Sequence, residues 1–282
     1  MAGSRIGFIG GGNMARAIAG GLVRSGYGAH NLLIAEPRPE QRAQLALELP
    51  GATVTADNDA VASAADNLLL AVKPQILREV CTGIRAAVQK SRPLVISIAA
   101  GPAVDDIDGW LGGGLEIVRA MPNQPALVDR GIAALYANPR TGQAGRELAG
   151  KVLAAVGSVV WVEDESLLDA VTAVSGTGPA YVYLLIDMMI EAAVAFGIPP
   201  DVARRLAIET ACGAAELART GEEPMTALIE RVRSPGGTTT AAFEQLEAHD
   251  VRGIFARAIA AARDRARELA AEARATTPTD PS

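Results

Sequence analysis

The chain has 282 residues, 49% of them apolar, and a formal net charge of −6. A chain of this length can form one large domain or two ordinary ones, and its apolar fraction is sufficient for a substantial core. The negative charge and the lack of a basic block exclude a typical nucleic-acid-binding surface.

The two cysteines, Cys81 and Cys212, are far apart and have no metal-ligand spacing. They argue against a disulfide framework and a zinc site, so we predict no metal, and they suit a reducing compartment. No charged and then apolar leader is present, and no apolar run approaches the roughly 20 residues of a membrane span. We therefore expect a cytoplasmic protein with neither a membrane nor a nucleic-acid partner.

A Gly-x-Gly-x-x-Ala pattern, from Gly10 to Ala15, lies between a predicted strand at residues 5–9 and an alanine-rich helix that ends near Ser25. In such patterns the first glycine permits the turn, the second lets a pyrophosphate approach the backbone, and the small third residue lets helix and strand pack closely. A second strand at residues 31–35 completes a strand–helix–strand unit. The pattern therefore predicts a dinucleotide-binding turn.

The second strand ends at Glu36 and Arg38. An acidic residue at this place accepts a hydrogen bond from the ribose 2′-hydroxyl of NAD, whereas an arginine favours the 2′-phosphate of NADP. Because both are present, these residues alone leave the choice of cofactor open.

Further apolar strands alternate with predicted helices, at residues 67–72, 94–98, 115–119, 131–137 and 158–162. This alternation indicates an α/β fold with a parallel sheet covered on both faces, in which ligands bind at the carboxyl ends of the strands. Lys73, Ala100 and Asn123 would lie on that rim, although Asn123, between two prolines, could serve only the turn.

No convincing strand is predicted after residue 164. We therefore expect a Rossmann-like dinucleotide-binding domain of residues 1–164, an all-α domain of residues 165–275 and a disordered polar tail of residues 276–282. The predicted helix of residues 181–196 is apolar nearly all round, which indicates burial in a core or in a subunit interface.

The stretch from Ser234 to Thr240 separates two helical patterns. Pro235 and two glycines end the preceding helix and permit a tight turn, and a new helix follows. The N–H groups and the dipole at the start of that helix suit a small carboxylate, with a threonine hydroxyl beside it. The alternative is an ordinary helix N-cap provided by a threonine.

The scarcity of lysine and histidine limits the chemistry. Reduction of a carbonyl needs a proton donor at the oxygen. In β-hydroxyacid dehydrogenases a lysine of the helical domain provides it, but no lysine follows Lys151 here, and the loop position of His249 favours a surface residue over a base. A protonated imine is already electrophilic, so its reduction needs no strong acid, and the Ser234–Thr240 loop fits that chemistry.

Six stretches, in order along the chain, resemble the pyrroline-5-carboxylate reductase family: Ile6–Met14, Ala71–Pro74, Ser97–Gly101, Arg119–Asn123, Ala173–Tyr181 and Ser234–Thr239. The resemblance implies reduction of 1-pyrroline-5-carboxylate to L-proline, the final step of proline biosynthesis, with NADPH and also with NADH. It further implies that the helical domain binds substrate and forms an interlocked homodimer, often assembled into a decamer. The pocket would then combine one subunit's cofactor with the helices of its partner.

Together with Glu36 and Arg38, the resemblance defines the predicted sites. The cofactor-binding set is Ile9, Gly10, Gly11, Gly12, Asn13, Met14, Glu36, Arg38, Asn58, Ala71, Val72, Lys73, Pro74, Ala99, Ala100 and Gly101. The substrate-binding set is Gly236, Gly237, Thr238, Thr239, Ser175 and Glu165. The resemblance makes Thr239 the catalytic residue, hydrogen-bonded at the ring nitrogen.

Two positions depart from the family pattern. Gln124 stands where members often have threonine, with little expected effect. Arg231 stands where some members have an asparagine that contacts the cofactor, and it could instead reach toward an anionic group. Two other functions stay open: a reductase of a different imine, and a non-catalytic nucleotide sensor, against which the intact glycine-rich and Gly-Gly-Thr-Thr loops argue.

Overall fold

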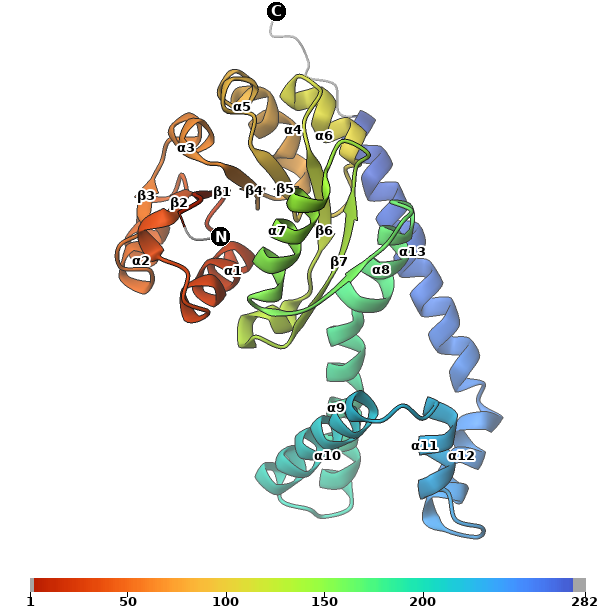
Figure 1. Cartoon of the computed structure of the whole chain (residues 1–282). Helices are drawn as coiled ribbons and strands as arrows, with labels where there is room; N and C mark the ends of the chain where they lie inside the picture. Colours follow the sequence, from red (N-terminus) through yellow and green to blue (C-terminus); the bar gives the residue numbers. More distant parts are fainter. Residues whose placement is uncertain (1–2, 276–282) are drawn as a thin grey trace, which may run out of the picture. The chain divides into compact units, whose positions relative to one another are not determined.

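The computed structural model describes residues 3–275, which pack into two compact units (Figure 1). The sheet unit contains the N-terminal part of the chain through Gly176 and the C-terminal part from Ala262, and the helical unit spans Thr177–Ala261. The domain boundary predicted at residue 164 stays a prediction; in space, residues 165–176 belong to the sheet unit. The disordered tail predicted for residues 276–282 lies outside the described residues.

The sheet unit is built on eight strands in the order β3-β2-β1-β4-β5-β6-β7-β8, and the predicted Rossmann-like fold is confirmed. The strands are β1 (Ile6–Ile9), β2 (Leu32–Ala35), β3 (Thr53–Thr55), β4 (Asn67–Leu70), β5 (Leu94–Ser97), β6 (Ile117–Met121), β7 (Gly131–Ala137) and β8 (Gly157–Trp161). Strand β3 was not predicted, because its three residues are not buried and form no apolar run.

The sheet departs from the parallel pattern at one place. Strands β1 to β6 pair in parallel, β7 runs antiparallel to β6, and β8 is again parallel to β7. The connection from β6 to β7 contains only the short 3-10 helix η2 (Gln124–Val128). A parallel pair needs a crossover of about a dozen residues or more, so this short connection returns the chain in the opposite direction.

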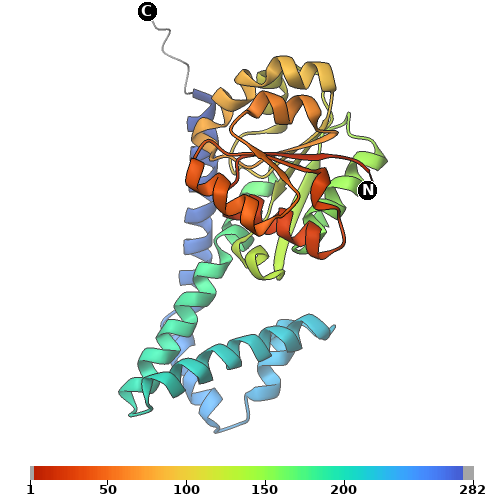
Figure 2. The same ribbon diagram turned by 90° about the vertical axis from the view of Figure 1, so that its left-hand side faces the viewer.

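Two layers of helices cover the sheet (Figures 1 and 2). One face is packed by α1 (Asn13–Arg24), α2 (Pro39–Glu48) and α7 (Gln143–Ala154). The other is packed by α3 (Asn58–Ala64), α4 (Pro74–Gly83), α5 (Arg85–Ser91) and α6 (Val104–Leu111). Neighbouring residues point to opposite layers, as alternation in a strand requires: Phe8 packs in the first core and Ile9 in the second.

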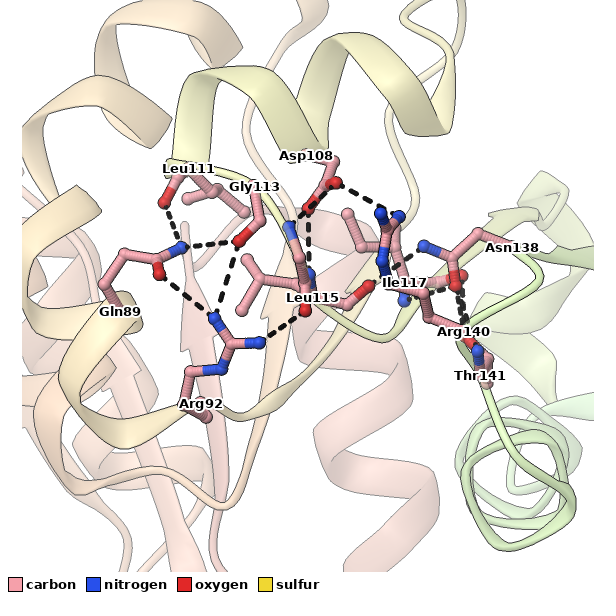
Figure 3. Close-up of polar contacts among 11 residues, drawn as sticks. Gln89, Arg92, Asp108, Leu111, Gly113, Leu115, Ile117, Asn138, Arg140 and Thr141 are labelled. Atoms are coloured by element: carbon pink, nitrogen blue, oxygen red, sulfur yellow. Dashed lines mark hydrogen bonds and ion pairs between the residues drawn. The ribbon is translucent and has the colours of Figure 1, made fainter.

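Polar side chains fix the amino end of β6 (Figure 3). Asp108 of α6 accepts hydrogen bonds from the N–H groups of Gly114 and Leu115, each 3.0 Å long. Asn138, which is 3% exposed, accepts from the Ile117 N–H at 3.2 Å and donates to the Leu115 carbonyl at 3.0 Å. These bonds satisfy backbone groups that the sheet leaves unpaired, and they set where β6 begins.

The helical unit contains α9 (Gly178–Ala195), α10 (Pro200–Thr220), α11 (Met225–Val232), α12 (Thr238–Ala248) and the first part of α13 (Val251–Ala275). None of the side chains of α9 is buried within the chain, although the helix is strongly apolar. Within the described chain α9 therefore does not occupy a core position, and its exposed apolar surface is compatible with the predicted subunit interface.

The expectation that no apolar segment approaches the length of a membrane span is wrong. The helical segment Leu167–Ala195, made of α8 (Leu167–Val171), a π-helical turn and α9, is long and apolar enough to span a membrane by length and composition alone. The helical path continues between α8 and α9 through the π-helical turn Thr172–Gly176.

Candidate functional site

The carboxyl ends of the parallel strands form the site of the sheet unit. The order of strands reverses between β1 and β4, so the loops after these two strands diverge at a switch point, where such sheets bind ligands. Gly10 follows β1 with φ of 100°, and a Cβ at this position would lie 2.8 Å from the Ala71 carbonyl oxygen after β4. Only glycine fits there, which confirms the reason for the first glycine of the turn.

The start of α1 is open to an anion. Gly12 is the N-cap, no side chain among the described residues caps it, and the first turn carries no acidic residue. A Cβ built on Gly12 would meet open space, and Asn13 is exposed. Free N–H groups and the positive end of the helix dipole therefore face a region that a pyrophosphate can enter, and the residues fit a dinucleotide.

Glu36, at the end of β2, is turned inward. It is 3% exposed and accepts hydrogen bonds from the Gly11 N–H at 3.1 Å, the Arg38 N–H at 3.1 Å and Arg38 Nε at 2.9 Å. Burial raises the pKa of the Glu36 carboxyl, but these hydrogen bonds outweigh burial and hold the pKa below its usual value. The carboxylate thus holds the glycine-rich turn.

Two side chains of α2 complete this corner, and sequence reasoning missed both. Gln41 Nε2 donates to the Gly11 carbonyl at 2.7 Å, so Gly11 is held at its N–H and at its carbonyl. Arg42 Nη1 donates to the carbonyls of Glu36 and Pro37 at 2.9 and 2.7 Å. Polar residues in the first turns of the helix after β2 were the available signal, because that helix must start beside the turn.

The other predicted cofactor residues lie in loops on the same rim. Lys73 is the exposed N-cap of α4, Asn58 opens α3 beside β3, and Ala99 to Gly101 follow β5. The structure therefore places the whole predicted cofactor-binding set at the carboxyl edge of strands β1 to β5, or in helices that start there.

Alternate residues at the end of β6 hold the segment of residues 165–176. Arg119 Nη1 donates to Glu165 Oε1 at 2.9 Å, and Asn123 Nδ2 donates to the Ser175 carbonyl at 3.2 Å. Between them, Met121 packs against Gly176, where a Cβ would lie 2.6 Å from Met121 Cε. Two predicted substrate residues, Glu165 and Ser175, are thereby placed on one face of β6. Asn123 also accepts from the Ile132 N–H at 3.0 Å, so it serves both the turn and this segment.

The Ser234–Thr240 loop lies in the helical unit. The N-cap of α12 is Gly237, and no side chain of the described residues caps it, so the alternative of a threonine N-cap is wrong. Thr238, Thr239 and Thr240 form the first turn, and Thr240 Oγ1 donates to the Ser234 carbonyl at 2.7 Å. A Cβ on Gly237 would lie 2.4 Å from Ser234 Oγ and 3.0 Å from the Ser234 carbonyl oxygen, so this close turn favours glycine.

The charged residues near this loop have partners elsewhere. Arg233 contacts Glu247 at 3.0 Å, and its guanidinium lies 5.4 Å from the centre of the Phe243 ring. Arg231 pairs with Glu223 at 2.5 Å. His249 is exposed, and its Nδ1 lies 2.8 Å from the Gln245 carbonyl oxygen at the end of α12, as expected for a surface residue. The loop therefore offers N–H groups and hydroxyls without a titrating side chain of its own.

A Rossmann-type sheet with an uncapped glycine-rich turn, joined to a helical unit, defines the chain as a dinucleotide-binding oxidoreductase. Residues 5–101 match the family "NADP oxidoreductase coenzyme F420-dependent", and residues 165–269 match "Pyrroline-5-carboxylate reductase dimerisation". The chain belongs to the pyrroline-5-carboxylate reductase family.

Relatives cover nearly the whole chain. The pyrroline-5-carboxylate reductase of Pseudomonas aeruginosa is 43% identical over 94% of this chain and 97% of its own length. The solved reductase structure from Coxiella burnetii is 38% identical, with a TM-score of 0.89 over 94% of this chain and 98% of its own. The Plasmodium falciparum enzyme, solved with NADP bound, is 27% identical, with a TM-score of 0.85 over 96% of this chain and 99% of its own.

Proposed function

We infer that this chain reduces 1-pyrroline-5-carboxylate to L-proline with NAD(P)H. The observation that carries the inference is the uncapped start of α12, where Thr238 and Thr239 present N–H groups and hydroxyls. A site of this kind binds a carboxylate and leaves acid–base chemistry to the substrate, which suits a protonated cyclic imine. The family membership of the chain supports the same reaction.

In the proposed mechanism, the substrate carboxylate lies against the N–H groups of Thr238 and Thr239, while the Gly237 N–H donates to the Ser234 carbonyl at 3.0 Å. The iminium N–H donates a hydrogen bond to Thr239 Oγ1, which holds the C=N bond in one orientation. NAD(P)H, when bound, supplies the hydride that adds to the imine carbon. The nitrogen keeps its hydrogen and takes a second proton from water, which gives the ammonium form of proline. Gly236 allows the turn, with φ of 69°, and Ser175 and Glu165 are proposed to border the pocket.

We further propose that NADPH is preferred and that NADH is also accepted. Glu36 is buried and already accepts three hydrogen bonds, so it is poorly placed to accept one from a ribose 2′-hydroxyl. The side chain of Arg38 is 66% exposed and, with Arg42, gives positive charge at the end of β2. This arrangement suits a 2′-phosphate. The pyrophosphate would lie over Gly10 to Met14, with Asn58 near the ribose and the loops Ala71–Pro74 and Ala99–Gly101 at the nicotinamide.

The proposed assembly is a homodimer formed by the helical domain, further assembled into a decamer in the cytoplasm. The exposed apolar side chains of α9 support the dimer, because a soluble chain does not leave such a helix in water. They include Val182, Tyr183, Leu184, Leu185 and Met188.

The activity is tested by the loss of NADPH absorbance with 1-pyrroline-5-carboxylate. The Thr239→Ala variant should lower kcat at least tenfold with little change in thermal stability, and Thr239→Ser should restore much of the rate. Thr220→Ala is the matched control, since its hydroxyl bonds only to backbone carbonyls of α10. No oxidation of NADPH or NADH at high enzyme concentration contradicts the proposed function, and full activity of Thr239→Ala contradicts the role of Thr239.

The cofactor preference is tested with Arg38→Ala. This change removes positive charge from the proposed 2′-phosphate site and releases Glu36 Oε1 from the hydrogen bond of Arg38 Nε, while the bond from the backbone N–H of residue 38 is kept. We expect the ratio of kcat/KM for NADPH to kcat/KM for NADH to fall at least tenfold. An unchanged ratio argues that the 2′-phosphate is bound elsewhere.

A further inference from the structure

Glu165 and Arg119 form a polar clamp beside the loop that follows β5. Glu165 Oε1 accepts from the Val104 N–H at 2.8 Å and from Arg119 Nη1 at 2.9 Å. Arg119 belongs to β6 and is 6% exposed. Val104 is the first residue of α6, so a carboxylate from outside this helix occupies its N-terminus, as an N-cap would.

The clamp fixes the loop Ile98–Ala103, which runs from β5 to α6. At one end of the loop, Ala103 N–H donates to Asp106 Oδ2 at 3.0 Å, and Glu165 holds the adjoining Val104 N–H. In the middle, Gly101 has φ of 103°, and its Cβ position lies 3.4 Å from Ala270 Cα of α13. The path of the loop is thus set by hydrogen bonds at the start of α6 and by a helix behind Gly101.

A cavity of about 300 Å³ lies next to this loop, within the sheet unit. Its lining includes Gly101, Ala103, Arg119, Glu165, Asp169 and Arg267. Because the loop borders an open space here, close packing does not fix it on this side. On this side the hydrogen bonds of Glu165 fix the start of α6, and the buried guanidinium of Arg119 holds the carboxylate in place.

We propose that Glu165, held by Arg119, is a positioning residue that fixes the Ala99–Gly101 loop for the nicotinamide half of the cofactor. The proposal rests on the cofactor site proposed above and assigns Glu165 a role beyond bordering the substrate pocket. Glu165 acts on the loop through the Val104 N–H. A shifted loop weakens contacts with the nicotinamide and leaves the adenosine half, bound at β1, β2 and β3, unchanged.

The test compares a whole dinucleotide with its adenosine fragment, by titration calorimetry on the purified full chain. Glu165→Ala should weaken binding of NADPH at least fivefold and leave binding of 2′,5′-ADP within twofold. Glu165→Gln keeps an acceptor for the Val104 N–H but loses the charge opposite Arg119, so it should lie between the wild type and Glu165→Ala. NADH and ADP are used as a second pair of dinucleotide and fragment. The matched control is Glu163→Gln, which removes a negative charge from an exposed neighbour of Glu165.

Selective loss of dinucleotide binding, partly rescued by glutamine, supports the proposal. Equal loss for dinucleotide and fragment indicates a general structural defect and overturns it, as does unchanged binding of both. If Glu165→Ala does not fold, Glu165→Gln carries the test, with a selective loss of at least twofold expected. In turnover, the variants should raise KM for NADPH. A wild type that binds NADPH but does not reduce this imine refutes the proposed function alone.

Discussion

Replacement of Glu36 by glutamine tests whether this carboxylate holds the glycine-rich turn or accepts a hydrogen bond from the ribose 2′-hydroxyl of the cofactor. The carboxylate accepts from Gly11 N–H, Arg38 N–H and Arg38 Nε. Glutamine has one side-chain oxygen in place of two. If this oxygen keeps the hydrogen bonds from Arg38, the NH₂ group of the glutamine faces the Gly11 N–H, and this buried N–H loses its acceptor. Such a loss costs about 2 kcal/mol, and the ion pair with the exposed Arg38 adds only about 0.5 kcal/mol. We expect Glu36→Gln to lower the free energy of unfolding by roughly 2.5 kcal/mol.

The pH dependence of this difference follows from the pKa of Glu36. The folded state holds this pKa below its usual value, so the carboxylate contributes its full stabilisation above the unfolded pKa of 4.5. That contribution is lost as the pH falls from 4.5 through the folded pKa, whereas glutamine does not titrate. Urea denaturation should therefore show the full difference between wild type and Glu36→Gln at pH 8 and a smaller one below pH 4.5.

Binding separates the two roles of Glu36. If the carboxylate holds Gly11, Glu36→Gln weakens NADH and NADPH binding by the same factor, because both cofactors use the turn. If the carboxylate accepts from the ribose 2′-hydroxyl, the variant loses NADH binding alone. Glu40→Gln, an exposed neighbour in α2, is the control for the loss of one negative charge. A selective loss of NADH binding, or a stability difference that does not change with pH, refutes the holding role.

Three further predictions concern other parts of the molecule. Burial raises the pKa of the Cys81 thiol to about 12, so Cys81 should not react with Ellman's reagent at pH 8 until the protein unfolds, and Cys81→Ser should remove one thiol from the unfolded count only. Asn138→Ala should lower the free energy of unfolding by about 3 kcal/mol in urea titrations, because it leaves buried backbone groups of β6 unpaired; a loss below about 1 kcal/mol contradicts this. Leu185→Glu should shift the chain from dimer to monomer in analytical ultracentrifugation and abolish activity, whereas Leu47→Glu, the same change on an exposed leucine of α2, should not.

The sequence predicted those parts of the fold that local rules determine. Continuous apolar runs located the central strands, and the glycine-rich turn located the switch point at Gly10. The short elements α2, α3 and β3 were missed, because their stability comes from packing against the sheet rather than from their own pattern. The antiparallel turn into β7 depends on the length of one connection, which hydrophobicity does not report.

The loops of the candidate site were predicted from the sequence, but the side-chain pairings that hold them were not, for a similar reason. Motifs gave the loops on the rim of the sheet, because each is a contiguous stretch with a fixed backbone role. They gave no sign of Gln41, Arg42 or the pairing of Arg119 with Glu165, which join residues far apart in the sequence. For the pairing of Arg119 with Glu165, the available clue is an arginine inside an otherwise apolar strand, since a buried guanidinium needs an acceptor.

Charge in this chain positions backbone rather than transferring protons. Glu36 holds Gly11, and Glu165 with Arg119 holds the start of α6. The loop before α12 has N–H groups and hydroxyls at its helix start and no titrating group of its own. In the proposed mechanism the protonation that makes the C=N bond reactive belongs to the substrate, so the pH dependence of turnover near neutrality should follow the pKa of the imine. Variants of Thr239 should change the rate without moving that pH profile, which distinguishes a hydrogen-bonding hydroxyl from a proton donor.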